Sequence, residues 1–334
     1  MKAIGNKGLM RRIKTLTTSV FLGSAALCTA MPAQAAYPER PVRLVVGFSP
    51  GGSDISARLV AQKLSERWGQ SIVVENRPGA GGNIGATQVA RADPDGYTIL
   101  LMVNSYTINT TVYENLPWDL LKDFEPLGRY AQSPMVAVVN DKLPVKTLAE
   151  FVDYAKSRPG TLNYGSAGTG TAPHLAVEVF ADQTDLKLTH VPYKGSGPSV
   201  TALAADEVQL AFGAMSAFEA LITDGRLRPL AVTTSQRFSQ LPNVPTVVES
   251  GVGIDEFDLN ISYGFLAPAG TPQEIVQKFS DDLGKVMQDP DLRKALAQRG
   301  LDPVYMDHQQ TADLMKKEVG FWAEISQRLG LKLN

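Results

Sequence analysis

The sequence predicts an α/β protein made of two units, in each of which helices flank a central sheet. Apolar runs such as 42–48 and 97–103 are typical of strands buried on both faces, because they do not alternate with polar residues. Each run leads into a loop and then a helical pattern, and the same succession returns after residue 135. Strand, loop and helix repeated in this way indicate a parallel sheet.

In the first part of the chain the expected strands are 42–48, 71–75 and 97–103. A helix should follow the first strand, because Asp54 and Arg58 are spaced to pair on one helix face. A second, short helix should begin at Asn83.

The second part repeats this pattern with further strands, expected at 135–139, 162–164, 188–191, 208–212, 228–233 and 261–267. Thr147 and Glu150 have the spacing of a capping box, which predicts a helix from there through Lys156. The other helices are expected from about 173 and 199, and at 271–287, 289–300 and 311–329.

These elements suggest two lobes of ordinary domain size. We expect one lobe to comprise 37–130 and 259–305, and the other to comprise 131–258, with the chain crossing between them within 117–134 and 242–258. The last helix, 311–330, is not assigned to either lobe. In open α/β sheets ligands bind beyond the carboxyl ends of the strands, so a cleft between the lobes is the expected site.

The first 35 residues are typical of a secretory signal peptide. Five basic residues precede a short apolar run, and Ala33-Gln34-Ala35 has the pattern of a cleavage site. A membrane anchor is the alternative, but the run is short for a span. Cleavage after Ala35 by the general secretory route would leave 299 residues with a net charge of −7, without the single cysteine, Cys28. We therefore expect a soluble periplasmic protein.

Composition and spacing exclude several classes of function. A near-neutral chain, with 32 basic and 34 acidic residues, does not indicate a nucleic-acid binder. His174, His190 and His308 lack metal-ligand spacing, and neither a P-loop nor a dinucleotide motif occurs. We expect no metal and no cofactor. The segment 163–168 does not match G-x-S-x-G, so no catalytic residue is predicted and the protein is not expected to be an enzyme.

Four glycine-rich turns precede helices, at 51–52, 79–85, 165–171 and 195–197. Such a turn either packs a helix closely or offers the free N–H groups of the helix N-terminus to an anion. His174 could contact a ligand or lie partly exposed at a helix start, and Asp54 could be an acid/base or a cap. Lys194 could face an acidic ligand or be solvated, whereas His190 is expected to be structural.

Several motifs resemble the Bug family, the periplasmic solute-binding proteins of tripartite tricarboxylate transporters. They are the segments 37–43 (YPERPVR), 50–58 (PGGSDISAR), 75–85 (ENRPGAGGNIG), 95–98 (DGYT), 162–171 (LNYGSAGTGT), 191–195 (VPYKG) and 267–272 (APAGTP). The resemblance covers 37–333. Family members often have two residues between Gly-Gly and the aspartate, whereas only Ser53 stands between Gly52 and Asp54 here.

The resemblance implies a hinged, two-lobed periplasmic-binding-protein fold that holds a ligand carboxylate between 48–54 and 166–174, with 104–105, 193–195 and 214–216 selecting the rest of the ligand. The implied ligand-binding residues are Phe48, Ser49, Gly51, Gly52, Ser53, Asp54, Asn104, Ser105, Ser166, Gly168, Thr169, Thr171, His174, Tyr193, Lys194 and Gly195. Family ligands include tricarboxylates, dicarboxylates, acidic amino acids and aromatic acids. The scarcity of Lys and Arg in these loops argues against a fully paired tricarboxylate.

The implied function is that of a monomeric receptor, which delivers the ligand to the membrane permease of a secondary transporter. Two alternatives remain at this point. The same binding module could serve a membrane sensor kinase, or the protein could be a periplasmic enzyme acting on a small acid.

Overall fold

The computed structural model describes Met1 and residues 37–332. The chain divides into two units, Met1–Glu39 and Arg40–Asn334, and all helices and strands described below belong to the second. The predicted signal peptide, apart from Met1, lies outside the described residues.

The first part of the sheet is built around β1 (Val42–Val46), which pairs in parallel with β2 (Ile72–Asn76) and β3 (Thr98–Val103). This confirms the three expected strands. The next strand, β9 (Asn260–Pro268), pairs antiparallel to β3, with Leu100 opposite Leu266. The sheet is therefore mixed: β1, β2 and β3 are parallel, as the repeated strand, loop and helix pattern predicts, whereas β9 is antiparallel, which the sequence did not predict.

A single long strand, β4 (Phe124–Asn140), joins the two parts of the sheet. It pairs antiparallel with β9 over 124–134, and its last residues pair with β7 (Leu210–Ala214) and β8 (Leu227–Val232). The sequence predicts only its end, 135–139, because Pro126 and Pro134 interrupt the apolar pattern. The pairing of β4 with β9 shifts register after Pro126, and such irregularities let a strand accommodate proline. Most of the segment expected to cross as a connection, 117–134, is thus strand.

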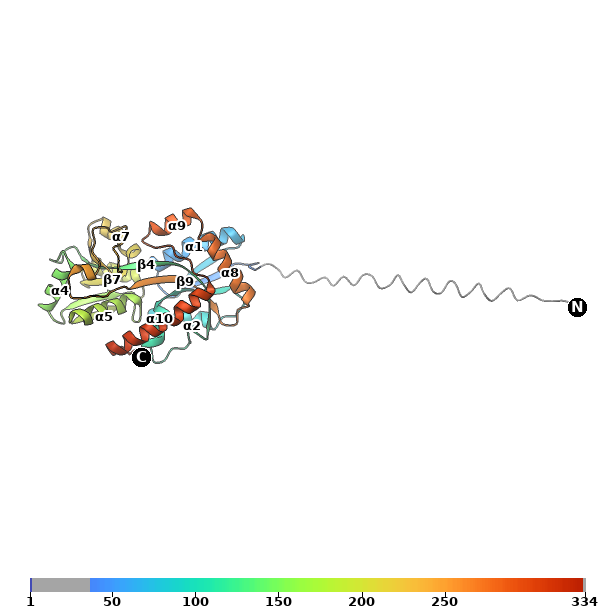
Figure 1. The fold of residues 1–334 in the computed structure, drawn as a ribbon, viewed down its shortest axis with the longest axis horizontal. Helices are drawn as coiled ribbons and strands as arrows, with labels where there is room; N and C mark the ends of the chain where they lie inside the picture. The colour runs from blue at the N-terminus through green and yellow to red at the C-terminus, as the bar shows by residue number, and fades with distance from the viewer. Residues whose placement is uncertain (2–36, 333–334) are drawn as a thin grey trace. The chain divides into compact units, whose positions relative to one another are not determined.

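In the second part of the sheet β5 (Leu162–Ser166) lies between β6 (Leu188–Pro192) and β7, parallel to both. The order of the sheet is β2-β1-β3-β9-β4-β7-β5-β6, with β8 also paired to β4. Its middle strands β9, β4 and β7 are labelled in Figure 1. This is the sheet flanked by helices that the sequence predicts. The boundaries of the two lobes stay a prediction.

The helices are α1 (Gly52–Trp68), α2 (Asn83–Ala90), α3 (Ser105–Val112), α4 (Leu148–Lys156), α5 (Ala172–Thr184), α6 (Ser196–Ala204), α7 (Met215–Thr223), α8 (Gln273–Val286), α9 (Pro290–Ala297) and α10 (His308–Leu329), with short 3-10 turns at Ala80–Gly82 and Val248–Ser250. Two of them, α3 and α7, were not expected, because each is short and α3 is rich in threonine. Helix α6 begins three residues earlier than predicted. Pro272, rather than Thr271, immediately precedes α8.

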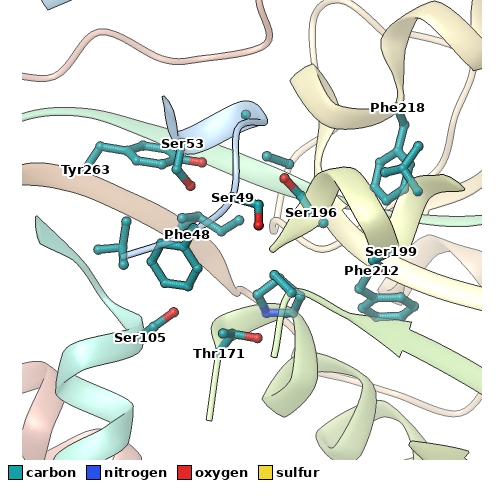
Figure 2. A pocket seen from close by; sticks show the side chains of 18 residues that line it. Phe48, Ser49, Ser53, Ser105, Thr171, Ser196, Ser199, Phe212, Phe218 and Tyr263 are labelled. Atoms are coloured by element: carbon teal, nitrogen blue, oxygen red, sulfur yellow. The ribbon is translucent and has the colours of Figure 1, made fainter. Parts of the chain in front are cut away.

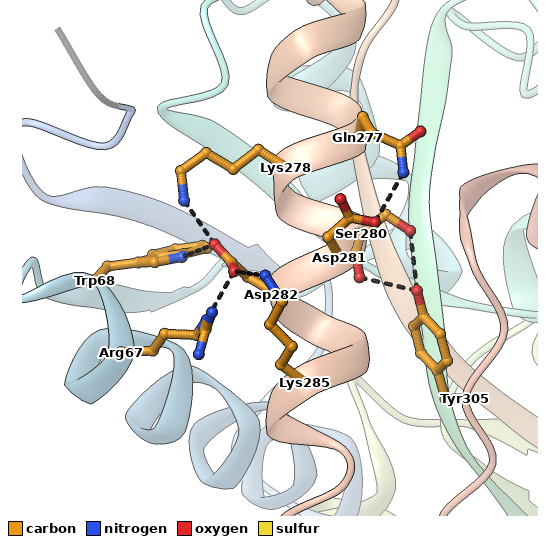
Figure 3. Close-up of polar contacts among 9 residues, drawn as sticks. All are labelled: Arg67, Trp68, Gln277, Lys278, Ser280, Asp281, Asp282, Lys285 and Tyr305. Carbon is orange, nitrogen blue, oxygen red and sulfur yellow. Dashed lines mark hydrogen bonds and ion pairs between the residues drawn. The ribbon is translucent and has the colours of Figure 1, made fainter.

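A buried carboxylate fastens α1 to α8 (Figure 3). Asp282 is 4% exposed and accepts hydrogen bonds from Arg67 at 2.7 Å, Trp68 at 2.9 Å and Lys278 at 2.6 Å. Burial alone would raise the pKa of Asp282, but these hydrogen bonds outweigh it and hold the pKa well below its usual range. The ionised carboxylate is therefore part of the folded structure.

Across the described part of the chain, the helices are all too short or too polar to span a membrane.

Candidate binding site

The site begins at the turn between β1 and α1. Phe48, Ser49, Gly52 and Ser53 line a cavity of about 40 Å³, which we call the main cavity (Figure 2). Its other lining residues are Val103, Ser105, Ala167, Thr171, Pro173, Ser196, Ser199, Val200, Phe212, Gly213, Ala214, Phe218, Ile261 and Tyr263. A space of this size holds a few water molecules, so a larger ligand requires the surrounding loops to separate.

The N-termini of five helices surround the main cavity. Each of α1, α3, α5, α6 and α7 contributes a lining residue from its first two positions or from the residue just before it: Gly52, Ser105, Thr171, Ser196 and Ala214. None of these five termini carries a side-chain cap hydrogen bond. No cap residue takes their first N–H groups, although the Ala172 N–H of α5 donates to Ser105 Oγ, and the helix dipoles add partial positive charge.

Of the five helices that start elsewhere in the described residues, α4, α9 and α10 have side-chain caps, whereas α2 and α8 have none. Thr147 accepts a hydrogen bond from the backbone of α4, Asp289 caps α9, and Asp307 forms a full capping box with Gln310 on α10. All five helices that start at the main cavity lack a side-chain cap, against two of the five that start elsewhere. Uncapped termini converging on one cavity form a place suited to an anion.

The side chains of the main cavity are neutral donors and apolar groups. Hydroxyls come from Ser49, Ser53, Ser105, Thr171, Ser196, Ser199 and Tyr263, and among its described lining residues none is acidic, basic or histidine. Burial raises the pKa of Tyr263, an effect that a hydrogen bond with Ser53 only partly offsets. Its hydroxyl is thus neutral and able to donate. An anion bound here is stabilised by hydrogen bonds and dipoles rather than by a counter-charge.

The loops around the cavity touch one another. The Ser49 N–H donates to the Lys194 carbonyl at 3.0 Å, and the Ala172 N–H donates to Ser105 Oγ at 3.4 Å. A Cβ on Gly51 would lie only 2.6 Å from Ser196 Oγ. The glycine at this position therefore serves the close approach of two loops.

A second space, the loop cavity, has a volume of about 250 Å³. The glycine-rich segment 79–82 lines it, together with Gly47, Phe48, Tyr113, Ala167, Gly168, Thr169, Pro192, Tyr193 and Lys194. Phe48 and Ala167 line both cavities and so lie between them. Lys194 brings a positive charge to the loop cavity and not to the main one.

The structure divides the predicted ligand-binding residues into three groups. Those that line the main cavity are Phe48, Ser49, Gly52, Ser53, Ser105 and Thr171. Those that line the loop cavity are Phe48 again, Gly168, Thr169, Tyr193 and Lys194. Those that line neither are Gly51, Asp54, Asn104, Ser166, His174 and Gly195.

Two residues of the last group, Asp54 and Asn104, make contacts within the fold instead of lining a cavity. Asp54 is buried in the first turn of α1, and Arg58 donates to both its carboxylate oxygens at 2.9 and 3.0 Å. It is neither a free acid/base nor the cap residue, because the helix starts two residues earlier. Asn104 donates from Nδ2 to the carbonyl of Asn260 at 2.8 Å and thereby ties β9 to the start of α3.

His174 and His190 belong to a buried aromatic stack. Their ring centroids are 4.0 Å apart, and Tyr164 stacks on His190 at 4.8 Å. Burial, with a smaller effect of His190, lowers the pKa of His174 to about 3, and burial lowers that of His190 to about 4. Both rings are neutral near pH 7, and the expectation of a structural His190 fits this arrangement.

Ser166 lies 2.7 Å from His190 Nε2, a serine–histidine contact that the sequence did not suggest. Ser166 is 1% exposed and lines neither cavity, so its hydroxyl is out of reach of a substrate in this conformation. Within the described residues, no group of three or more His, Cys, Asp or Glu side chains could hold a metal ion.

Sequence reasoning missed the lining residues that lie outside the segments it singled out: Val103, Ser199, Val200, Phe212, Gly213, Phe218, Ile261 and Tyr263. Pro173 lies within the predicted segment 166–174. Ser196 and Ala214 lie in segments that the sequence did single out. The aromatic residues of β7, α7 and β9 look like ordinary core residues, and only their neighbours in space make them part of a cavity.

Comparison with known proteins agrees with this geometry. The family profile described as "Tripartite tricarboxylate transporter family receptor" matches residues 56–331. The chain is 33% identical over 317 residues to the protein BugT of Bordetella pertussis, covering 94% of this chain and 96% of BugT.

Two solved structures show the same fold. The Rhodopseudomonas palustris protein Rpa4515, solved with adipate, has a TM-score of 0.86 at 35% identity and covers 89% of this chain and 99% of its own. MatC from Rhodopseudomonas palustris, solved with bound malate, has a TM-score of 0.81 at 28% identity, with coverage of 86% and 99%.

The fold is that of a periplasmic solute-binding protein. The chain belongs to the receptor family of tripartite tricarboxylate transporters, as its resemblance to the Bug proteins predicts.

Proposed function

We propose that this protein is a receptor that binds a small organic acid through its carboxylate, held in the main cavity by backbone N–H groups and hydroxyls. The observation that carries the proposal is the convergence of five uncapped helix N-termini on one cavity without a charged lining residue. The adipate bound by Rpa4515 and the malate bound by MatC, both carboxylates, support it.

Binding proceeds by closure of two lobes around the ligand. The loops that meet at the cavity come from both ends of the sheet, β1–α1 from one and β5–α5 and β6–α6 from the other. They already contact each other, so ligand entry requires an open form in which these contacts are broken. Only contacts that exist in the closed form favour closure, and the bound carboxylate supplies further ones.

The receptor then delivers the acid to a membrane permease of the tripartite tricarboxylate type. It acts in the periplasm as a monomer after removal of residues 1–35, and it needs no cofactor. The family membership supports delivery to a transporter over a role as an enzyme, and so does the burial of the Ser166 hydroxyl, which lines neither cavity.

A substitution at the start of α6 tests the proposed site. Ser196→Asp places a negative charge at a helix N-terminus, where it stabilises the helix by about 0.3–1 kcal/mol, but it also repels a bound anion. Ser196→Asn is the matched neutral control of similar size. We expect the Asp variant to keep or raise the melting temperature and to lose carboxylate binding in calorimetry, while the Asn variant retains most of it. Equal binding by the two variants would count against an anion at this cavity.

The wild-type protein provides the broader test. Thermal shift across a panel of mono-, di- and tricarboxylates should reveal stabilisation by at least one acid, because a ligand that binds only the folded state raises its stability. If no acid stabilises the protein or gives heat on titration, the proposed function fails.

A further inference from the structure

The main cavity has two unlike ends. In Figure 2 Ser53, Ser105 and Tyr263 lie on the left of the view with Phe48 beside them, and the hydroxyls of Ser49 and Thr171 lie near its middle. In Figure 2 the rings of Phe212 and Phe218 lie on the right of the view, whereas Ser53 and Ser105 lie on its left. Val200, which also lines the cavity, belongs to the same core cluster as Phe218. We call Val200, Phe212 and Phe218 the apolar end.

The N-termini of α1, α6 and α7, which have no side-chain caps, lie close together. A Cβ on Gly51 would meet Ser196 Oγ at 2.6 Å, and one on Gly52 would meet Ser216 Oγ at 2.8 Å. The starts of α6 and α7 therefore abut the β1–α1 turn. Val200 is the fifth residue of α6 and Phe218 the fourth of α7, so each lies farther along its helix than the first N–H groups.

The apolar end is a fixed wall of the protein core. Phe212 and Phe218 are each 2% exposed and Val200 is 8% exposed. Phe212 is a residue of β7 paired with Ala137 of β4, and its ring packs 5.5 Å from that of Phe180. Side chains held in this way leave a ligand in contact with apolar surface at this end of the site.

A second carboxylate on the ligand would find no counter-charge at the apolar end. Among the residues described as lining the main cavity none is Lys or Arg, and Lys194 lines the loop cavity instead. Ser199 lies on this side in Figure 2, but its hydroxyl has a single hydrogen to donate. Burying an ionised group without such a partner is strongly unfavourable, whereas burying an apolar group there is favourable.

We infer that the receptor takes acids with one carboxylate and an apolar body, the carboxylate at the helix N-termini and the body against Val200, Phe212 and Phe218. This inference rests on the proposed function and narrows its ligand class. It sets this chain apart from the structures of relatives solved with the dicarboxylates adipate and malate.

Two pairs of acids test the inference on the wild-type protein, because within each pair only the second carboxylate differs. Hexanoate is compared with adipate, and benzoate with terephthalate, by isothermal titration calorimetry, with malate and citrate as polar references. We expect at least one monoacid to bind and to exceed its diacid partner tenfold or more in affinity, which is about 1.4 kcal/mol.

The outcomes separate the inference from the proposed function. If a diacid binds as tightly as or more tightly than its monoacid partner, or if only malate or citrate binds, the inference is overturned while the carboxylate receptor stands. If none of the six acids and no other carboxylate binds, the proposed function fails as well.

A pair of valine variants places the ligand body. Val200→Thr keeps the shape of the side chain and puts a hydroxyl at the apolar end, whereas Val208→Thr makes the same change in the same core cluster away from the cavity. We expect the first variant to weaken monoacid binding at least threefold and the second to leave it unchanged. Equal effects of both, with equal losses of stability, would overturn the assignment of this end to the ligand body.

Discussion

Substituting Gly81 by alanine tests whether the loops that meet around the cavities must close for binding. Gly81 has a φ of +62°, and a Cβ built there would lie 2.3 Å from the Thr169 carbonyl oxygen, which is backbone and cannot turn aside. Ordinary contacts of a Cβ begin at 3.4 Å, so segments 79–82 and 167–169 would have to move apart by about 1.1 Å.

Two costs follow from this substitution, and they can be separated. The left-handed backbone costs alanine about 1–2 kcal/mol wherever it occurs. The displacement acts only on the closed form, and a misplacement of about 1 Å at a site can cost on the order of 100-fold. We expect a ligand dissociation constant raised by roughly that factor, equivalent to about 2.7 kcal/mol.

Gly160→Ala is the matched control, because Gly160 has a φ of +72° and no atom within 4 Å of a built Cβ. Both variants are measured by calorimetry with the tightest acid of the panel and by thermal unfolding without ligand. Gly81→Ala should match Gly160→Ala in unliganded stability and differ from it only in affinity. If Gly81→Ala binds as tightly as wild type, or loses far more stability than Gly160→Ala, the loops belong to one rigid body and the closure argument is refuted.

Two further predictions concern stability. Asp282→Asn leaves Arg67 and Lys278 without their carboxylate; because these partners are part-exposed, we expect a loss of about 2–3 kcal/mol at pH 7 by chemical denaturation. Folding lowers the pKa of Asp282, so the extra stability of wild type over Asp282→Asn should disappear as the pH falls below about 4. Equal free energies of unfolding of the two proteins at pH 7 would contradict a stabilising role of the Asp282 carboxylate. The pKa of His174 falls from its ordinary 6.5 to about 3 on folding, so below pH 6.5 the unfolded chain takes up the proton first. Between pH 7 and 5 this should lower the free energy of unfolding of wild type by about 2 kcal/mol. The free energy of unfolding of His174→Gln should fall less over the same range, and an equal fall in both proteins would argue against a neutral buried His174.

The strands and most helices are predictable because their signals are local. The apolar run at 42–48 forms β1, and Thr147, Asp289 and Gly330 mark helix ends as expected. Strand direction and length are not local properties. Residues 261–267 read as a strand in either direction, and only pairing with β3 and β4 makes β9 antiparallel. The first part of β4, with Pro126 and Pro134, has no clear strand signal.

For the proposed site, the sequence singles out several loops that the structure brings together, but not the direction in which each side chain points. Four predicted residues line the main cavity: Ser49, Ser53, Ser105 and Thr171. They lie in or just before the first turns of helices, and these helix starts face the cavity, so their position in the chain was enough to predict them. His174 stands in the same kind of position and yet turns into the stack with His190. Which way a side chain turns from a helix depends on the space its neighbours leave.

By itself the sequence determined the α/β class and the family, and it singled out the loops of the proposed site. The reason is that apolar periodicity, caps and glycine-rich turns depend only on residues that are close together in the sequence. The tertiary structure decided what those loops enclose. Phe212, Phe218 and Tyr263 line the main cavity only because β7, α7 and β9 are brought beside the uncapped helix starts. Burial and charge pairing depend on contacts between distant segments, so the apolar end, and with it the ligand class inferred here, could be derived only from the folded chain.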